Sequence, residues 1–137
     1  MLLPELGAYL IAQGVGTALG TDMFLGKLPP TPDAIVAIFE YASLADEPDL
    51  GVDGKNIRYE YPRVQIVCRG VRDDYATPRT TAQNAKKALM KVQGSTLTGT
   101  YYLAVTPESG PFFLRRDLND RLEFVTNFQV YKGLSAS

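Results

Sequence analysis

The side chains that could carry chemistry in this sequence are carboxylates, because none of its 137 residues is a histidine. The absence of imidazole excludes Ser-His-Asp and Cys-His nucleophile activation and most zinc, copper and non-haem iron sites. The remaining candidates for a Mg²⁺ site are Glu60, in a predicted strand, and the loop pair Asp73 and Asp74. Such carboxylates could hold a metal ion against substrate phosphates, so a Mg²⁺-dependent nuclease is one open alternative.

Three other features speak against catalysis. Asp73 and Asp74 directly precede a predicted helix, where acidic side chains commonly serve as caps. The single cysteine, Cys68, falls on the apolar side of a predicted strand and is expected to pack as a small hydrophobic residue. The Gly14-Val15-Gly16 segment lacks the third glycine and the Gly-Lys-Ser/Thr that phosphate-binding loops need. We therefore predict a protein that is not an enzyme and has no catalytic residue, no cofactor and no metal.

The aromatic side chains suggest a second alternative. Eight tyrosines and six phenylalanines could stack bases if they lay on exposed strand faces, as in single-strand nucleic-acid binders. A net charge of −1 gives no cationic excess for gripping duplex DNA. The adjacent pairs Tyr101-Tyr102 and Phe112-Phe113 each place one ring on either face of a strand. An outward apolar ring favours a protein–protein surface.

The elements that would position these residues form one α+β domain. A first helix is predicted over residues 4–13, and a second starts near Thr77 and ends at Gly94. Alternating or continuous apolar runs predict the strands 22–28, 34–41, 63–69, 100–106, 112–117 and 121–131. This order predicts a mixed or mainly antiparallel sheet with two helices packed on one side.

Length and composition bound the organisation of the chain. At 15.0 kDa, residues 1–137 are expected to form a single domain. Residues 42–58 carry turn and charge signals and are predicted to be a mobile loop or a hairpin, and 133–137 a frayed tail. One cysteine allows no intramolecular disulfide, and the apolar run 6–12 is too short to span a bilayer. We expect no membrane association and a cytoplasmic site of synthesis.

The segment from Arg115 to Arg121 is a dense turn of alternating charge. Within one subunit it would be a solvated turn whose ion pairs contribute little to stability. Across a subunit boundary it would set register and partner choice, because misplaced like charges are costly. The sequence leaves both interpretations open.

Ordered stretches along most of the chain match a known family pattern. They are Leu6-Gly7-Ala8-Tyr9-Leu10, Gly14-Val15-Gly16-Thr17, Asp22-Met23-Phe24-Leu25-Gly26-Lys27-Leu28-Pro29, Ala37-Ile38-Phe39-Glu40-Tyr41, Tyr61-Pro62-Arg63-Val64-Gln65-Ile66, Phe112-Phe113-Leu114-Arg115-Arg116-Asp117, Arg121 and Asn127-Phe128. Together they resemble the minor capsid, or tail terminator, proteins of long-tailed bacteriophages. Segment 46–58 is longer than this resemblance leads us to expect.

The resemblance implies a structural role. Such proteins are tail-terminator-like α+β domains that assemble, usually as a six-fold ring, on the end of the tail tube, where they halt tube polymerisation and offer a face to the head. The implied partners are further copies of the chain in a hexameric ring, the major tail tube protein and the head-side connector or stopper protein. DNA would pass through without tight binding. The implied location is the head-proximal end of the tail in the virion, after assembly in the host bacterial cytoplasm.

A ring subunit needs two different contact surfaces, and two-sided apolar strands and doubled aromatic residues could provide them. The candidate subunit-interface residues are aromatic, basic or acidic side chains of strands and turns: Phe24, Lys27, Arg63, Arg69, Tyr102, Phe112, Phe113, Arg115, Arg116, Asp117 and Arg121.

Overall fold

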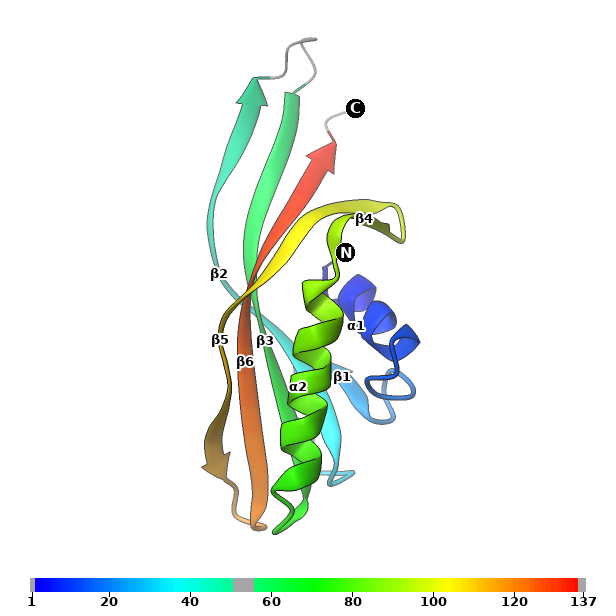
Figure 1. Cartoon of the computed structure of the whole chain (residues 1–137), viewed down its shortest axis with the longest axis vertical. Helices are drawn as coiled ribbons and strands as arrows, with labels where there is room; N and C mark the ends of the chain where they lie inside the picture. The colour runs from blue at the N-terminus through cyan, green and yellow to red at the C-terminus, as the bar shows by residue number, and fades with distance from the viewer. Residues whose placement is uncertain (1, 51–55, 136–137) are drawn as a thin grey trace.

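One six-stranded sheet forms the body of the protein in a computed structural model that describes residues 2–50 and 56–135. The strands are β1 (Met23–Leu25), β2 (Ile35–Leu50), β3 (Asn56–Arg72), β4 (Gln93–Leu97), β5 (Thr100–Arg116) and β6 (Arg121–Ser135). Their order across the sheet is β1-β2-β3-β6-β5-β4. Among the described strands, β1 and β2 pair in parallel and the other neighbours pair antiparallel, so the sheet is mixed (Figure 1).

Two helices, α1 (Leu2–Ala12) and α2 (Ala76–Met90), lie on the same side of this sheet (Figure 1). The core between helices and sheet is apolar, because the strands turn every second side chain towards the helices. It contains Leu6, Leu10, Val64, Ile66, Cys68, Ala82, Ala85, Leu89, Phe124 and Phe128, among others. The predicted α+β fold with two helices on one side of a mixed sheet is confirmed.

Helix α2 lies close to the sheet because its inward stripe consists mainly of small side chains. Ala82 and Ala85 are fully buried, and a Cβ on Gly70 of β3 would lie 2.8 Å from the Pro78 ring. The helix begins at Ala76 rather than Thr77, and Asp74 caps it by accepting a hydrogen bond from the Thr77 N–H at 3.2 Å. The capping role expected for an acidic residue here therefore belongs to Asp74.

Several strands differ in length from their predicted bounds. β1 ends at Leu25, because the chain turns away at Gly26 with a φ of 73°. β2 and β3 run on as an antiparallel pair to Leu50 and Asn56, and so occupy most of the segment predicted to be a mobile loop or hairpin. Residues 51–55 lie outside the described residues.

The C-terminal prediction was wrong for residues 133–135. They belong to β6 and pair with residues 57–59, because the extension of β3 offers them a backbone ladder. Residues 136–137 lie outside the described residues. β5 is likewise continuous, since the turn-like residues between Pro107 and Pro111 produce register shifts against β6 instead of a reversal.

A buried carboxylate ties the first helix to the far strands. Glu5 of α1 accepts hydrogen bonds from the Tyr102 and Thr100 hydroxyls, each at 2.7 Å. Burial alone would raise the pKa of Glu5, but these hydrogen bonds outweigh it and leave the pKa below its ordinary value. Burial, together with the hydrogen bond to Glu5, raises the pKa of Tyr102. The contact fixes α1 against β5.

The lowered pKa of Glu5 predicts a dependence of stability on acid. A carboxyl group whose pKa is lower in the folded state stabilises the fold above its unfolded pKa, and that stability is lost as pH falls through the folded value. Glu5→Gln should lower the free energy of unfolding at pH 7 by about 1–3 kcal/mol, because a charged acceptor is replaced. The substitution should also reduce the loss in free energy of unfolding as the pH falls from about 5 to about 3. Urea unfolding of both proteins across that range measures this, and parallel curves would contradict it.

Within the described residues, no helix is both long enough and apolar enough to cross a bilayer.

Candidate functional site

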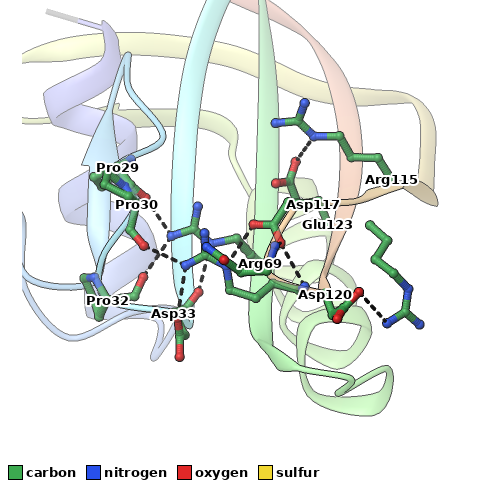
Figure 2. A network of polar contacts seen from close by, with 12 residues as sticks. Pro29, Pro30, Pro32, Asp33, Arg69, Arg115, Asp117, Asp120 and Glu123 are labelled. Carbon is green, nitrogen blue, oxygen red and sulfur yellow. Dashed lines mark hydrogen bonds and ion pairs between the residues drawn. The ribbon is translucent and has the colours of Figure 1, made fainter.

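Two arginines on the helix-free face of the sheet hold a proline-rich loop against it (Figure 2). Arg69 of β3 donates hydrogen bonds to the carbonyl oxygens of Pro29 at 2.6 Å, Pro32 at 2.8 Å and Asp33 at 3.0 Å. Burial lowers the pKa of Arg69, and the neighbouring positive charge of Arg121 lowers it further. The forked guanidinium donates to three carbonyls at once, so Arg69 acts as a clamp.

Arg121, the first residue of β6, completes this clamp and also closes the β5–β6 turn. It donates to the Pro30 carbonyl at 2.6 Å, to the Asp33 carboxylate at 3.0 Å and to the Asp117 carboxylate at 2.8 Å. Asp117 also accepts the backbone N–H groups of Asn119 and Arg121, each at 2.9 Å. Desolvation would raise the pKa of Asp117, but these hydrogen bonds lower it overall. The turn is therefore internally paired.

The remaining charges at this end of the molecule also pair within the chain. Arg115 donates to the buried Glu123 at 2.9 Å, and Arg116 pairs with Asp73. Arg72 lies 3.3 Å from Asp120. The ion pairs of Arg116 and Arg72 are exposed on both sides and contribute little to stability, whereas Glu123 is buried. All three arginines have a carboxylate partner within the chain. Ion pairs within the chain are therefore present in the charged turn, as one of the two interpretations predicts.

A hollow of about 430 Å³ lies between the clamped loop and the charged turn. Its walls combine apolar and charged side chains: Leu28, Pro30, Arg69, Arg115, Arg116, Asp117, Leu118, Asn119, Arg121 and Glu123. Leu118 is fully exposed, with a relative exposure of 102%. A partner that covered this turn would remove the Leu118 side chain from water.

The last part of β5 adds more exposed apolar area next to this turn. Phe112, Phe113 and Leu114 are exposed by 40%, 49% and 46%. We call these three residues, with Leu118, the β5 patch. Phe113 packs edge-on against Phe124 of the core at a ring distance of 5.9 Å, so the patch is anchored to the fold.

The centre of the helix-free face is polar and its side chains pair with one another. Gln65 donates to Asn127 at 3.1 Å, and Asn127 donates to Ser109 at 3.0 Å. Arg63 reaches Gln129 at 3.1 Å and Glu108 at 3.3 Å. Side chains from β3, β6 and β5 thus form hydrogen-bonded rows across the strands. These polar side chains thus have hydrogen-bond partners within the chain.

The carboxylates of the nuclease alternative are not brought together. Glu60 and Asp73 lie near opposite ends of β3, separated by roughly 40 Å of extended chain at the usual rise per residue. Glu60 lies 3.9 Å from Lys132, while Asp73 pairs with Arg116 and Arg72. Among the residues that the structure describes, no three carboxylate or thiol groups cluster as metal ligands.

Cys68 is fully buried, and burial raises the pKa of its thiol to about 12. A thiol with so high a pKa is protonated at neutral pH. It packs in the core beside Ile66 and Phe124, as predicted for a small hydrophobic side chain.

The structure divides the candidate interface residues into two groups. Buried within the subunit are Phe24, Arg69, Tyr102 and Arg121, so we remove them from the candidate set. Each is satisfied or packed internally, which a sequence pattern of alternating faces could not reveal. The outward ring of the tyrosine pair is Tyr101, exposed by 41%. Arg63 and Asp117 keep internal partners, and the exposed or half-exposed candidates that remain are Lys27, Arg63, Phe112, Phe113, Arg115, Arg116 and Asp117.

Two residues of this surface were missed from the sequence. Leu118 lies between Asp117 and Asn119 in the charged turn, and a single leucine in a polar turn is too common on protein surfaces to mark a contact residue. Leu114 was missed because it occupies a register shift between Phe113 and Arg115, which strand alternation does not predict.

Comparison with known proteins decides the family. The family profile described as "Bacteriophage tail terminator protein" matches residues 9–132. The chain belongs to this family. No curated protein matches the chain.

A solved chain from a structure titled "Virion of native gene transfer agent (GTA) particle" has a similar fold. Its TM-score is 0.51 at 19% sequence identity, and the match covers 91% of this tail terminator and 84% of the other chain. The family gives this tail terminator a structural role in a phage tail, which is not an enzymatic class. The resemblance to tail terminators noted from the sequence is confirmed.

Proposed function

We propose that this tail terminator forms a ring, expected to be a hexamer, that caps the head-proximal end of the tail tube. The ring ends tube polymerisation and offers its other side to the head-side connector or stopper protein. The observation that carries the proposal is the family match over residues 9–132. The protein is assembled in the host bacterial cytoplasm and becomes part of the virion.

The β5 patch is the surface that we assign to the tube protein. Leu118 is wholly exposed and follows the exposed Phe112 and Phe113 along the chain, so the burial of these side chains against a partner would remove apolar area from water. Arg115 and Arg116 flank the patch and provide a polar rim. A patch at one end of a long sheet suits contact with the end of a tube.

Passage of DNA through the ring without tight binding is consistent with the charges of the subunit. Its net charge is −1, and Arg69 and Arg121 already donate to carbonyl or carboxylate oxygens of their own chain. Tight binding of a phosphate backbone requires several cations free to displace its counterions. The hydrogen-bonded amides of the helix-free face are likewise committed to one another.

Electron microscopy of the tube protein polymerised with and without the terminator tests the proposal. We expect shorter tubes that carry added density at one end only when the terminator is present. Leu118→Asp should abolish the cap, because it places a charge in the β5 patch. The free energy of unfolding of this variant should stay within about 0.5 kcal/mol of the wild-type value, since Leu118 is exposed.

Leu103→Asp is the matched control, because Leu103 is 45% exposed on β5 but lies outside the β5 patch. This variant should cap tubes as the wild type does. Tubes of unlimited length with bare ends in the presence of wild-type protein would overturn the proposed function.

A further inference from the structure

The exposed face of α2 is cationic, and the chain around it contains no acid. Between residues 75 and 107 the charged residues are Arg79, Lys86, Lys87 and Lys91, with no Asp or Glu. Lys86 is half-buried and donates to the Gly110 carbonyl at 3.2 Å. Lys87 and Lys91 are exposed and lie four residues apart, on one face with Asn84. This cationic face has no carboxylate of its own element beside it.

The chain around β2 has the opposite charge. Between residues 28 and 54 there are six acids and no Lys or Arg: Asp33, Glu40, Asp46, Glu47, Asp49 and Asp53. Glu40 is exposed, and with Asp46, Glu47 and Asp49 it belongs to β2. Charges of one sign are therefore gathered along one strand, and charges of the other sign along one helix.

The backbone of β2 is also open on its outer side. β1 pairs with β2 only at Val36, Ala37 and Ile38. Beyond Ile38, no strand in the described part of the chain pairs with that edge of β2. A long edge strand without a partner is usually protected by charge or covered by another chain.

The two charged surfaces belong to different parts of the sheet. β2 is next to the β1 edge, whereas α2 packs over β3, β5 and β6 (Figure 1). Two different, complementary surfaces on one subunit make a head-to-tail contact, which closes into a ring when the rotation between copies allows it.

We propose that the exposed α2 face of one subunit binds the β2 strand of a second copy of this chain. The inference rests on the proposed ring and names the subunit contact within it. Complementary charge speeds encounter and fixes the register of the two copies, and like charges placed there repel each other. The contact should weaken as salt rises, because salt screens the attraction between opposite charges.

Charge reversal with a complementary rescue tests this contact. The α2 variant carries Lys87→Glu and Lys91→Glu, and the β2 variant carries Glu40→Lys and Glu47→Lys. Each variant alone sets like charges against like, so we expect its ring to dissociate at least about 100-fold more readily than the wild type. In a 1:1 mixture whose subunits alternate, reversed α2 of one variant meets reversed β2 of the other, and wild-type α2 meets wild-type β2. Opposite charges then face each other at every contact, so assembly should recover to within about tenfold of the wild type.

The readout is the assembly mass, by light scattering for free protein and by electron microscopy for protein on tube ends. Arg72→Glu is the control, because Arg72 has an exposed side chain at the end of β3, outside both surfaces. It should assemble as the wild type does. Thermal unfolding of each variant separates loss of the contact from loss of the fold.

The outcomes separate this inference from the proposed function. If the wild type forms rings and the single variants also assemble normally, the α2–β2 contact is wrong. The same holds if the mixture of the two variants does not recover assembly. In both cases the proposed ring is unaffected. Wild-type protein that forms no ring, either free or on tube ends, overturns the proposed function and this contact with it.

Discussion

Replacing Arg69 with leucine is expected to lower the free energy of unfolding by about 2–4 kcal/mol. The guanidinium donates to three carbonyl oxygens of the proline-rich loop, and leucine would leave all three without that donor. Arg69→Lys should recover only part of the loss, because a single ammonium group cannot reproduce a fork. Urea unfolding followed by circular dichroism measures both variants.

Arg72→Leu is the control for this prediction. Arg72 belongs to the same strand, but its side chain is 74% exposed and makes only exposed ion pairs. Its replacement should change the free energy of unfolding by no more than about 0.5 kcal/mol. If Arg69→Leu were equally mild, the loop would be held by its apolar contacts, such as that of Leu28, and not by the clamp.

Gly110→Ala is expected to cost at least about 3 kcal/mol and to weaken capping. Gly110 of β5 has a φ of 94°, and an added Cβ would lie 2.5 Å from the Val125 carbonyl oxygen of β6. Backbone cannot rotate away as a side chain can, so β5 would have to move off β6. Because Phe112 follows two residues later, the β5 patch would be displaced as well.

Gly99→Ala provides the matched control. Gly99 has a similar φ of 83°, but an added Cβ would meet nothing within 4 Å. Its cost should be limited to about 1–2 kcal/mol of backbone strain, with capping unchanged. Chemical denaturation and the tube-capping assay measure both glycine variants. If the two variants lost the same free energy of unfolding, the close approach of β5 to β6 would not contribute to the cost of Gly110→Ala.

The clamp and the close strand contact act on the same part of the molecule. Arg69 and Arg121 fix the loop that forms one wall of the hollow, and Gly110 lets β5 carry Phe113 and the β5 patch alongside β6. The proposed tube contact therefore rests on an element that the fold holds at several points. Rigid placement lowers the entropy that binding would otherwise cost.

Features that depend on local periodicity could be predicted from the sequence. Alternating Val64, Ile66 and Cys68 have to face one side of a strand, and Ala82 and Ala85 have to share one face of a helix, whatever lies around them. The α+β class, the helices on one side and the burial of Cys68 all follow from such patterns. So does the expectation of one outward ring in the Tyr101-Tyr102 pair.

Packing between distant segments of the chain determines which polar side chains are buried and which are exposed. Arg69 and Lys87 are both cations on amphipathic elements, yet Arg69 is buried because Pro29 and Asp33 come from a distant loop to accept its hydrogen bonds. Tyr102 is buried because Glu5 arrives from the first helix. A buried polar group is stable only with a partner, and partners distant in the chain are supplied by packing, not by sequence spacing.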